Sequence, residues 1–516
     1  MSTKVSLDGI NKLYKTKELI DKASGRIYDL VKRTSLHKSQ NLSNKNNIYF
    51  KREDEQQVFS FKIRGAYNKM LEIKNKDSQI YACSAGNHAQ GVALAGTHLN
   101  FSTHIVMPIK TPEIKVINVK RFGGNVILFG SNFDEAKSKC YELAQENNGS
   151  IVDPFDDLEV IAGQGTVGKE IWEEMPNVDY IFAPIGGGGL ISGVASYIKF
   201  MNPNIKVIGV QTYDSNGMYL SINEKEKIIL PNVGLFSDGT AVKEVGNLTY
   251  EICQEILDDI VLVDTDDICL AIKDVYNDTR NIMEPAGALS VAGMKKYINQ
   301  KQLNGKNIIS ILSGSNMDFK KISFVSDRAN IKTKKEVLLA ITIPEKPGTF
   351  LTMYNSIYPR NVLEFSYRYS NKETANIFIS FTVDTEEDMQ NVTHHIIKSI
   401  PTSTVIDISK DELAKTHLRF LMGGKVLNKP KNIIEKVYRF EFPEGPGALK
   451  KFLESLPVKW NVSLFHYKNY GDDIGRVLAG IQVPFSEESE LNIYLDKLGY
   501  EWTDESKNII YKNYIQ

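Results

Sequence analysis

The sequence is poor in features that mark several classes of protein. Its 516 residues include only four cysteines, Cys83, Cys140, Cys253 and Cys269. None of them belongs to a CxxC pair or lies at metal-ligand spacing from a histidine. No apolar run reaches the ~20 residues that a transmembrane helix needs, and the N-terminus has no apolar targeting segment. We therefore expect reduced thiols, no metal site, no membrane span and a cytoplasmic location.

An excess of charge of one sign is also missing. Lys and Arg number 62 and Asp and Glu 63, so the formal net charge is -1. The chain therefore has no excess of positive charge that would indicate binding to nucleic acid or to an acidic membrane surface. The apolar fraction of 42% and the charged fraction of 24% are ordinary for a globular protein. At ~150 residues per domain, the length suggests about three domains.

Short apolar runs alternate with helix-length segments in the first two thirds of the chain. The runs that predict strands are 48–50, 79–83, 103–108, 125–129, 180–185, 206–210 and 307–312. Predicted helices between them include His88–Gly96, Glu113–Phe122 and Phe133–Asn147. This alternation predicts a doubly wound α/β fold with a largely parallel sheet. Ligands of such folds bind beyond the carboxyl ends of the strands, so loops that follow strands deserve the closest inspection.

The last third of the chain contains an internal repeat. The segment ITIPEKPGTFLTMY at 341–354 matches FEFPEGPGALKKFL at 440–453, and VLEFSYRYS at 362–370 matches VSLFHYKNY at 462–470. Two matches in the same order predict two α+β units of βαββαβ type, although coincidental Pro-Gly turns are the alternative. The polar stretch 326–336 is interpreted as a linker. The predicted domains are therefore 1–325, 337–410 and 436–510.

Two motifs in the first half combine reactive or anion-binding groups with small residues. In SFKIRGAY, 60–67, Lys62 lies between apolar neighbours. A lone lysine is usually a solvated charge, but burial would turn its amine into a Schiff-base nucleophile. In SAGNHAQGVA, 84–93, small residues lead from a strand into a helix. Backbone N–H groups at such a helix start bind anions, whereas an ordinary helix turn with a satisfied His88 is the alternative.

Two further motifs complete a recognisable set of contacts. PIGGGGLISG, 184–193, places four consecutive glycines after a strand, which suits a nest of N–H groups around a phosphate. It lacks the lysine of a GxxxxGK[ST] loop and the spacing of GxGxxG, so a phosphate without a nucleotide fits better. SGSN, 313–316, offers a hydroxyl for a neutral ring nitrogen, or is a simple turn. Together these are the contacts that a pyridoxal phosphate enzyme needs.

These motifs and the doubled C-terminal unit resemble the biosynthetic, allosteric threonine deaminases (threonine ammonia-lyases), which are fold-type II pyridoxal phosphate enzymes. The resemblance covers nearly the whole chain. It implies β-elimination of L-threonine to 2-oxobutanoate and ammonia, the first step of isoleucine biosynthesis. It also implies that Lys62 carries the cofactor as a Schiff base and removes the α-proton. The implied cofactor contacts are Lys62, Phe61, Asn87, Gly186, Gly187, Gly188, Gly189, Leu190 and Ser313.

In the same resemblance Asn87 contacts the 3-oxygen of the cofactor and Ser313 the pyridine nitrogen. Glu284 is expected near the ring. The substrate carboxylate is expected at the loop formed by Ser84, Ala85, Gly86, Asn87 and His88.

The doubled unit resembles two ACT-like subdomains that bind isoleucine as inhibitor and valine as activator, in a homotetramer. The implied effector contacts are Glu345, Phe365, Tyr367 and Arg368 in the first repeat, and Glu444, Phe465, Tyr467 and Lys468 in the second. Each aromatic residue is equally well explained as part of a core.

Two other functions share part of this pattern. A catabolic serine/threonine dehydratase or a serine racemase would have the first half, but the C-terminal repeat argues against them. A non-catalytic amino-acid sensor would have the fold, but the intact motifs argue against it.

Overall fold

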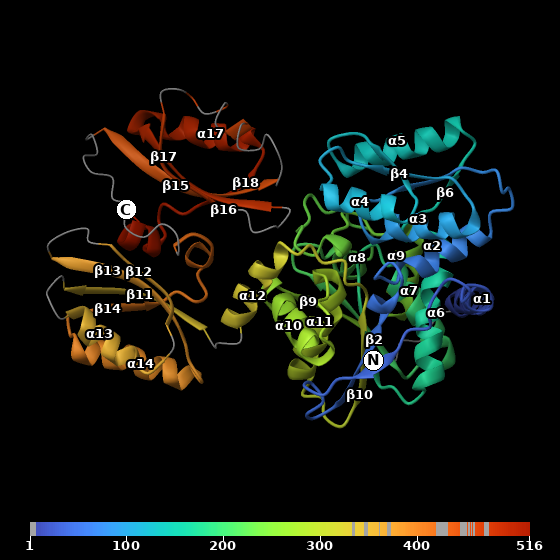
Figure 1. The fold of residues 1–516 in the computed structure, drawn as a ribbon, viewed down its shortest axis with the longest axis horizontal. Helices are drawn as coiled ribbons and strands as arrows, with labels where there is room; N and C mark the ends of the chain where they lie inside the picture. The colour runs from blue at the N-terminus through green and yellow to red at the C-terminus, as the bar shows by residue number, and fades with distance from the viewer. Residues whose placement is uncertain are drawn as a thin grey trace. The chain divides into compact units, whose positions relative to one another are not determined.

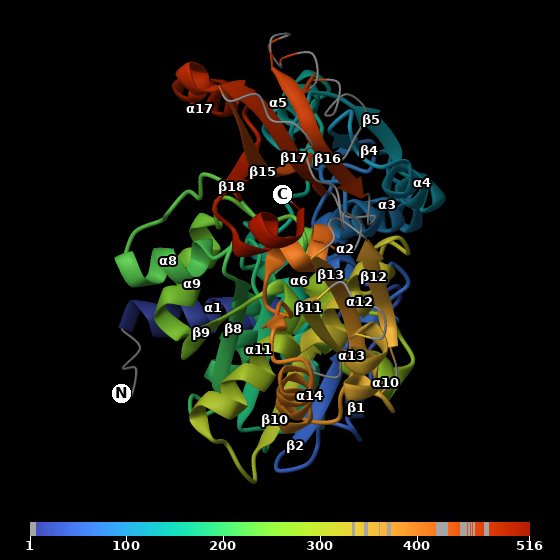
Figure 2. The same ribbon diagram turned by 90° about the vertical axis from the view of Figure 1, so that its left-hand side faces the viewer.

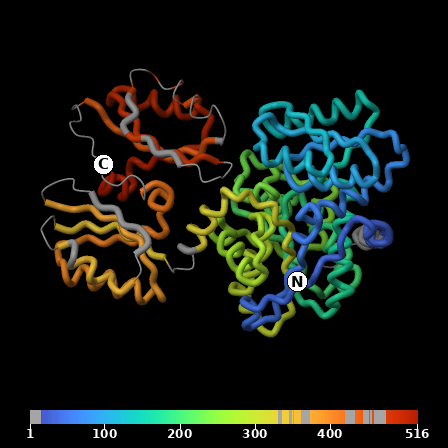
Figure 3. Tube along the Cα trace, viewed as in Figure 1, coloured from blue at the N-terminus to red at the C-terminus, as the bar shows by residue number. Residues whose placement is uncertain are grey.

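The computed structural model describes residues 7–332, 336–344, 349–360, 362–368, 373–418, 432–443, 451–452, 455, 457, 460–468 and 474–515 (Figure 3). The chain divides into two compact units, Met1–Asp318 and Phe319–Gln516. None of the described helices has both the length and the hydropathy of a bilayer-spanning segment.

The first unit is built on two sheets (Figure 1). The six-stranded sheet has the order β1 (Leu36–Lys38), β2 (Asn47–Arg52), β10 (Asn307–Leu312), β7 (Tyr180–Pro184), β8 (Lys206–Thr212) and β9 (Asp259–Val263). The four-stranded sheet has the order β5 (Asn125–Leu128), β4 (Thr103–Met107), β3 (Ile80–Cys83) and β6 (Ser150–Ile151). In the described residues of this unit the neighbouring strands are parallel, except that β1 is antiparallel to β2.

The strands and helices predicted between residues 47 and 315 are present, with ends displaced by at most three residues. The helices are α3 (Asn87–Leu99), α4 (Glu113–Arg121) and α5 (Phe133–Glu146). The fold class is thereby confirmed. The division into two sheets was not predicted, because an apolar run shows that a strand is buried but does not show which strand it pairs with.

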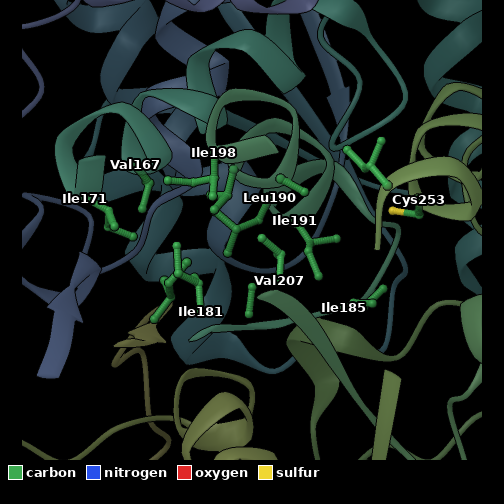
Figure 4. Close-up of a cluster of buried hydrophobic side chains, with 14 of the residues drawn as sticks. Val167, Ile171, Ile181, Ile185, Leu190, Ile191, Ile198, Val207 and Cys253 are labelled. Atoms are coloured by element: carbon green, nitrogen blue, oxygen red, sulfur yellow. The ribbon is translucent and has the colours of Figure 1, made fainter. Parts of the chain in front are cut away.

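A buried apolar cluster holds the six-stranded sheet against α6 (Leu158–Glu174) and α7 (Gly189–Met201), and Figure 4 shows part of it. Its members include Val167 and Ile171 from α6, Leu190, Ile191 and Ile198 from α7, and Ile181 and Val207 from the sheet. The two helices approach closely at Gly193 of α7. A Cβ on this residue would lie only 2.4 Å from the Ile161 carbonyl oxygen of α6. This packing fixes the start of α7, where the four-glycine segment ends.

The second unit contains two antiparallel sheets of the same design. The first has the order β12 (Val362–Arg368), β13 (Thr374–Thr382), β11 (Glu336–Pro344) and β14 (Thr404–Asp407), and the second β16 (Asn461–Lys468), β17 (Ile474–Pro484), β15 (Ile433–Pro443) and β18 (Glu501–Asp504). Phe365 pairs with Ile379, and Phe465 pairs with Ala479. A register irregularity follows Val362 in one sheet and Val462 in the other. The internal repeat is therefore a structural repeat.

Each sheet of the second unit is covered by helices on one face (Figures 1 and 2). Helices α13 (Thr349–Ile357) and α14 (Glu386–Ser399) pack on the first sheet, and α17 (Glu488–Leu498) packs on the second. The opposite faces share one core, in which Leu338 and Ala340 pack with Val437 and Leu478. The two subdomains are thus joined through a common apolar layer.

The polar stretch predicted as a linker, 326–336, is helical up to Lys332, where α12 (Lys321–Lys332) ends. Phe324, Val325 and Ala329 are buried and form an apolar side of this helix. The stretch as a whole is polar in composition, so this apolar side was not recognised in the sequence. Arg328 forms an ion pair with Glu412, and its guanidinium lies 4.9 Å from the Phe324 ring centre. The helix is therefore packed within the second unit instead of being a free loop.

Candidate active site

Three of the four motifs follow adjacent strands of the six-stranded sheet. Strand β10 lies between β2 and β7, and both pairings are parallel. The carboxyl end of β2 leads toward Lys62, that of β10 leads to Ser313, and that of β7 leads to the four-glycine segment. The fourth motif, with Asn87, follows β3 of the other sheet. Parallel pairing therefore gathers the first three motifs at one edge of this sheet, where ligands of such sheets bind.

Lys62 is the first residue of α2 (Lys62–Leu71), and its side chain is half-buried. The Nζ atom donates a hydrogen bond to the Pro154 carbonyl oxygen at 2.7 Å and lies 5.3 Å from the Phe61 ring centre. Burial lowers the pKa of Lys62 to about 8, and nearby Asp153 opposes this shift only in part. A desolvated lysine with this pKa exists partly as the neutral amine near neutral pH, which is the nucleophilic form.

The four-glycine segment presents its N–H groups and turns its carbonyls away. The Gly187 carbonyl accepts a hydrogen bond from Thr249 Oγ1 at 2.6 Å. In the described part of the chain, no N–H group of residues 186–190 donates a hydrogen bond. Gly188 has a φ of +99°, and a Cβ on Gly187 would lie 2.3 Å from the Phe155 ring. Unpaired N–H groups at the start of α7 form a site for an anion.

Residues 152–155, which follow β6, connect the parts of the site. Their contacts are the Val152 carbonyl with His88 Nε2 at 2.8 Å, the Pro154 carbonyl with Lys62, and the Phe155 ring with Gly187. Sequence reasoning missed this segment. The available signal was its place directly after a strand, which it shares with the motifs that were found.

The loop that carries Asn87 begins α3 next to Lys62. A Cβ on Gly91 would lie 3.1 Å from the Ile63 nitrogen, so a larger residue would require α3 and the start of α2 to move apart by a few tenths of an ångström. Among the described residues, the N–H groups of Asn87 and His88 donate no hydrogen bond. They can therefore receive a carboxylate.

His88 is buried and matches the alternative interpretation only in part, because its Nε2 has a partner whereas its Nδ1 has none among the described residues. Burial and the Lys62 charge lower its pKa to about 4, so the ring is neutral at neutral pH. The ring is held through Nε2 by the Val152 carbonyl, and the backbone N–H of His88 is available to a substrate.

Side chains from three segments meet at Asn87. Its Nδ2 donates to Glu284 Oε1 at 2.6 Å, and its Oδ1 accepts from Asn316 Nδ2 at 2.7 Å. Glu284 is buried and precedes α11 (Pro285–Lys301). Ser313 is also buried, and its hydroxyl donates to the Ala286 carbonyl at 3.1 Å. Asn316 was overlooked in the sequence, although it belongs to the SGSN motif that supplied Ser313.

The residues predicted to bind effectors lie on the repeated elements. Phe365, Tyr367 and Arg368 belong to β12, and Phe465, Tyr467 and Lys468 belong to β16. These are edge strands in equivalent places, and the structure does not describe the side chains at those positions. Glu345 and Glu444 lie outside the described residues.

Comparison with known proteins agrees with this site. Residues 27–314 match the family described as pyridoxal-phosphate dependent enzyme. Residues 327–418 and 428–515 match the C-terminal regulatory domain of threonine dehydratase. The fold and the site thus define a fold-type II pyridoxal phosphate enzyme with a regulatory domain.

Individual relatives narrow the family. The mitochondrial threonine dehydratase of Schizosaccharomyces pombe is 47% identical over 503 residues, covering 96% of this chain and 83% of that protein. The biosynthetic L-threonine dehydratase IlvA of Escherichia coli is 43% identical, covering 95% of each. The chain belongs to the family of biosynthetic threonine dehydratases, and the resemblance inferred from the motifs is confirmed.

Solved structures show the same relationship. A processed threonine deaminase isoform 2 from Solanum lycopersicum is 44% identical, with a TM-score of 0.61, over 62% of this chain and 89% of that one. Maize serine racemase is 32% identical, with a TM-score of 0.56, over 60% of this chain and 96% of that one. Nearly all of the racemase is thus matched by little more than half of this chain.

Proposed function

We propose that this protein is a pyridoxal-phosphate-dependent L-threonine ammonia-lyase, which forms 2-oxobutanoate and ammonia in the first step of isoleucine biosynthesis. The observation that carries the proposal is the half-buried Lys62 amine, which shares residues 153–155 with a four-glycine segment of unpaired N–H groups. A nucleophilic amine and an anion cradle held by one segment suit an aldehyde cofactor with a phosphate group.

The described residues fit this cofactor in kind and in charge. Lys62 would bind its aldehyde, with Phe61 packed alongside. The N–H groups of Gly186, Gly187, Gly188, Gly189 and Leu190 would hold the phosphate. Asn87 would donate to the 3-oxygen, and Ser313 would turn its hydroxyl hydrogen to the ring nitrogen. When bound, pyridoxal phosphate supplies an electron sink for the substrate α-carbon.

The protein's own groups then bind threonine and move its proton. The N–H groups of the Ser84–His88 loop hold the substrate carboxylate, which fixes the α-carbon in one orientation. Lys62 Nζ, once free and neutral, takes the α-proton as general base. The resulting ammonium stays oriented by its hydrogen bond to the Pro154 carbonyl. The β-hydroxyl then leaves with a proton as water, and the released enamine tautomerises to an imine, which water hydrolyses to 2-oxobutanoate and ammonia.

We expect covalent binding of pyridoxal phosphate to the apoprotein to accelerate with pH and to level off near pH 8. Only the neutral amine attacks an aldehyde, and burial lowers the pKa of Lys62 to about 8. Below that value the neutral fraction grows about tenfold per pH unit. Stopped-flow absorbance during reconstitution would measure the rate. A rate that still rises steeply at about pH 10, near the ordinary lysine value, would contradict the lowered pKa.

The regulatory part of the proposal concerns the second unit. We infer that residues 1–325 form the catalytic domain, and that the connection predicted at 326–336 is made largely by the end of α12. The ACT-like subdomains 337–410 and 436–510 bind isoleucine as inhibitor and valine as its antagonist, in a cytoplasmic homotetramer. The repeated edge strands β12 and β16 support this proposal, since they are equivalent strands of two sheets and contain six of the eight predicted effector residues.

A threonine assay titrated first with isoleucine and then with valine tests the function and its regulation together. At subsaturating threonine we expect isoleucine to lower the rate at least about fivefold and valine to restore it, since allosteric coupling is typically 1–3 kcal/mol. The same titration with serine in place of threonine compares the two substrates. If isoleucine does not inhibit ketoacid formation, a catabolic dehydratase is favoured instead. If neither threonine nor serine yields a ketoacid, a non-catalytic amino-acid sensor is favoured.

A further inference from the structure

The SGSN segment, 313–316, holds the stretch of chain that leads into Lys62. Three hydrogen bonds join the two segments: Phe61 N to the Ser313 carbonyl (3.1 Å), Ser315 N to the Phe59 carbonyl (2.9 Å) and Asn316 Nδ2 to the Val58 carbonyl (2.8 Å). A bridge between Ser60 and Gly314 lies among them. Phe59 has a φ of 56°, a left-handed value that is uncommon for a residue other than glycine. The approach to Lys62 is therefore fixed by contacts with SGSN.

Asn316 also determines how the Asn87 amide is turned. Its Nδ2 group donates to Asn87 Oδ1 at 2.7 Å as well as to the Val58 carbonyl. Asn87 Nδ2 donates to Glu284 Oε1 at 2.6 Å. Asn316 Nδ2 can only donate and Glu284 Oε1 accepts, so both partners fit the same orientation of Asn87. One hydrogen of Asn87 Nδ2 remains for another acceptor.

We propose that Asn316 is a positioning residue, which fixes the Asn87 amide so that its second N–H is available to the cofactor's 3-oxygen. This inference rests on the proposed function, namely on Asn87 contacting that oxygen. A second effect of the same side chain is to steady the segment that carries Lys62, through the Val58 carbonyl. Asn316 thus connects two parts of the site that come from different sheets.

The alternative is that Asn316 only stabilises the fold. Comparing the alanine and aspartate substitutions of Asn316 distinguishes this role from a positioning role. Asn316→Ala removes two donors and leaves Asn87 Oδ1 unpaired. Asn316→Asp keeps the size of the side chain but replaces its N–H donors with an acceptor oxygen. That oxygen would then lie against two other acceptors, Asn87 Oδ1 and the Val58 carbonyl, and would repel them. Asn87 can relieve this clash only by turning its own oxygen toward Glu284, which is also an acceptor. We therefore expect aspartate to impair the site more than alanine does.

The test uses the holoenzyme of both variants with Asn307→Ala as matched control. Asn307 stands at the opposite end of the same strand β10, where its side chain donates to the Asn177 carbonyl at 3.1 Å and accepts from Asn47 at 3.0 Å. The control therefore loses comparable bonds away from Lys62. The measurements are kcat, KM for threonine, the melting temperature, and the visible spectrum of the bound cofactor as a function of pH.

We expect kcat to fall about tenfold in Asn316→Ala and about a hundredfold in Asn316→Asp, because small misplacements of reacting groups cost up to ~100-fold. KM should change much less, and the melting temperatures of Asn316→Ala and the control should be similar. The spectral transition should move to higher pH, because a hydrogen bond to an anionic oxygen lowers its pKa and these variants weaken that bond. Equal effects of alanine and aspartate, with an unmoved spectral transition, would overturn the proposal.

Asn87→Ala separates this inference from the function on which it rests. If Asn87→Ala leaves the spectrum unchanged, Asn87 does not contact the 3-oxygen, and the inference fails with that contact. If Asn87→Ala shifts the spectrum but the Asn316 variants do not, only the positioning role is overturned. In the Asn87→Ala background, Asn316→Ala should lose most of its effect on kcat, because it acts largely through Asn87. Independent, multiplying effects would contradict the proposal.

Discussion

Replacing Lys62 with alanine should abolish both ketoacid formation from threonine and the visible absorption of the protein-bound Schiff base. We expect kcat/KM to fall at least ~1000-fold, since one amine serves as nucleophile and as general base, and general-base catalysis alone contributes up to 10⁴-fold. Lys62→Arg should be equally inactive, because a guanidinium keeps its charge in proteins. A steady-state assay and an absorption spectrum of each purified variant would measure both effects.

Lys69→Ala is the matched control for this experiment. Lys69 lies one and a half to two turns further along α2, where its Nζ is 2.5 Å from Asp157 Oδ2 in a partly exposed ion pair. Such pairs contribute about 0–1 kcal/mol, so the control should fold and turn over almost normally. Substantial turnover by Lys62→Ala, with an intact control, would show that another group performs the chemistry.

Replacing Arg64 with methionine should strongly destabilise the first unit, although Arg64 stands only two residues after Lys62. Its side chain is fully buried, with Nε 2.7 Å from Glu53 Oε2 and Nη1 2.6 Å from Glu170 Oε1. Lys51 Nζ lies 2.8 Å from the other oxygen of Glu170. The four side chains carry two positive and two negative charges, and the substitution would leave one buried negative charge unbalanced. Breaking a buried pair in this way costs about 3–5 kcal/mol.

Thermal and urea unfolding monitored on the first unit would measure this loss, with Arg33→Ala as control. Arg33 pairs with Glu173 at the surface, with about half of the side chain exposed, so its removal should cost at most about 1 kcal/mol. Adding Glu170→Gln to Arg64→Met should recover part of the lost stability, because it restores charge balance. If Arg64→Met unfolds under the same conditions as Arg33→Ala, the buried ion pairs contribute far less than we expect.

The effect of Arg64→Met should also depend on pH. Burial alone would raise the pKa of Glu170, but Arg64 and Lys51 outweigh it and hold the pKa at about 2. A carboxyl whose pKa is lowered by folding stabilises the protein above its unfolded value of about 4.3, and this contribution is lost as the pH falls toward the folded value. The difference between wild type and Arg64→Met should therefore narrow below about pH 4.

The sequence by itself predicted seven of the ten strands described in the first unit, because burial leaves a local apolar pattern in them, and it missed β1, β6 and β9. It also identified Lys62, Asn87, the four glycines and Ser313 as one set of chemical groups, since each motif is contiguous. The repeat was visible because both copies keep the same order of side chains. Arg64 shows the limit of such reasoning, because its motif gave no sign that it belongs to a buried ion network instead of the site.

Only the tertiary structure decided how strands divide between two sheets and which distant groups complete the site. The Pro154 carbonyl that holds Lys62 is 92 residues away along the chain, and Asn316 is 229 residues from Asn87. Thr249, which turns the Gly187 carbonyl away from the cradle, is 62 residues distant. No local pattern encodes these partners, because a backbone carbonyl or a single polar side chain acquires its role only when folding brings its partner within hydrogen-bonding distance.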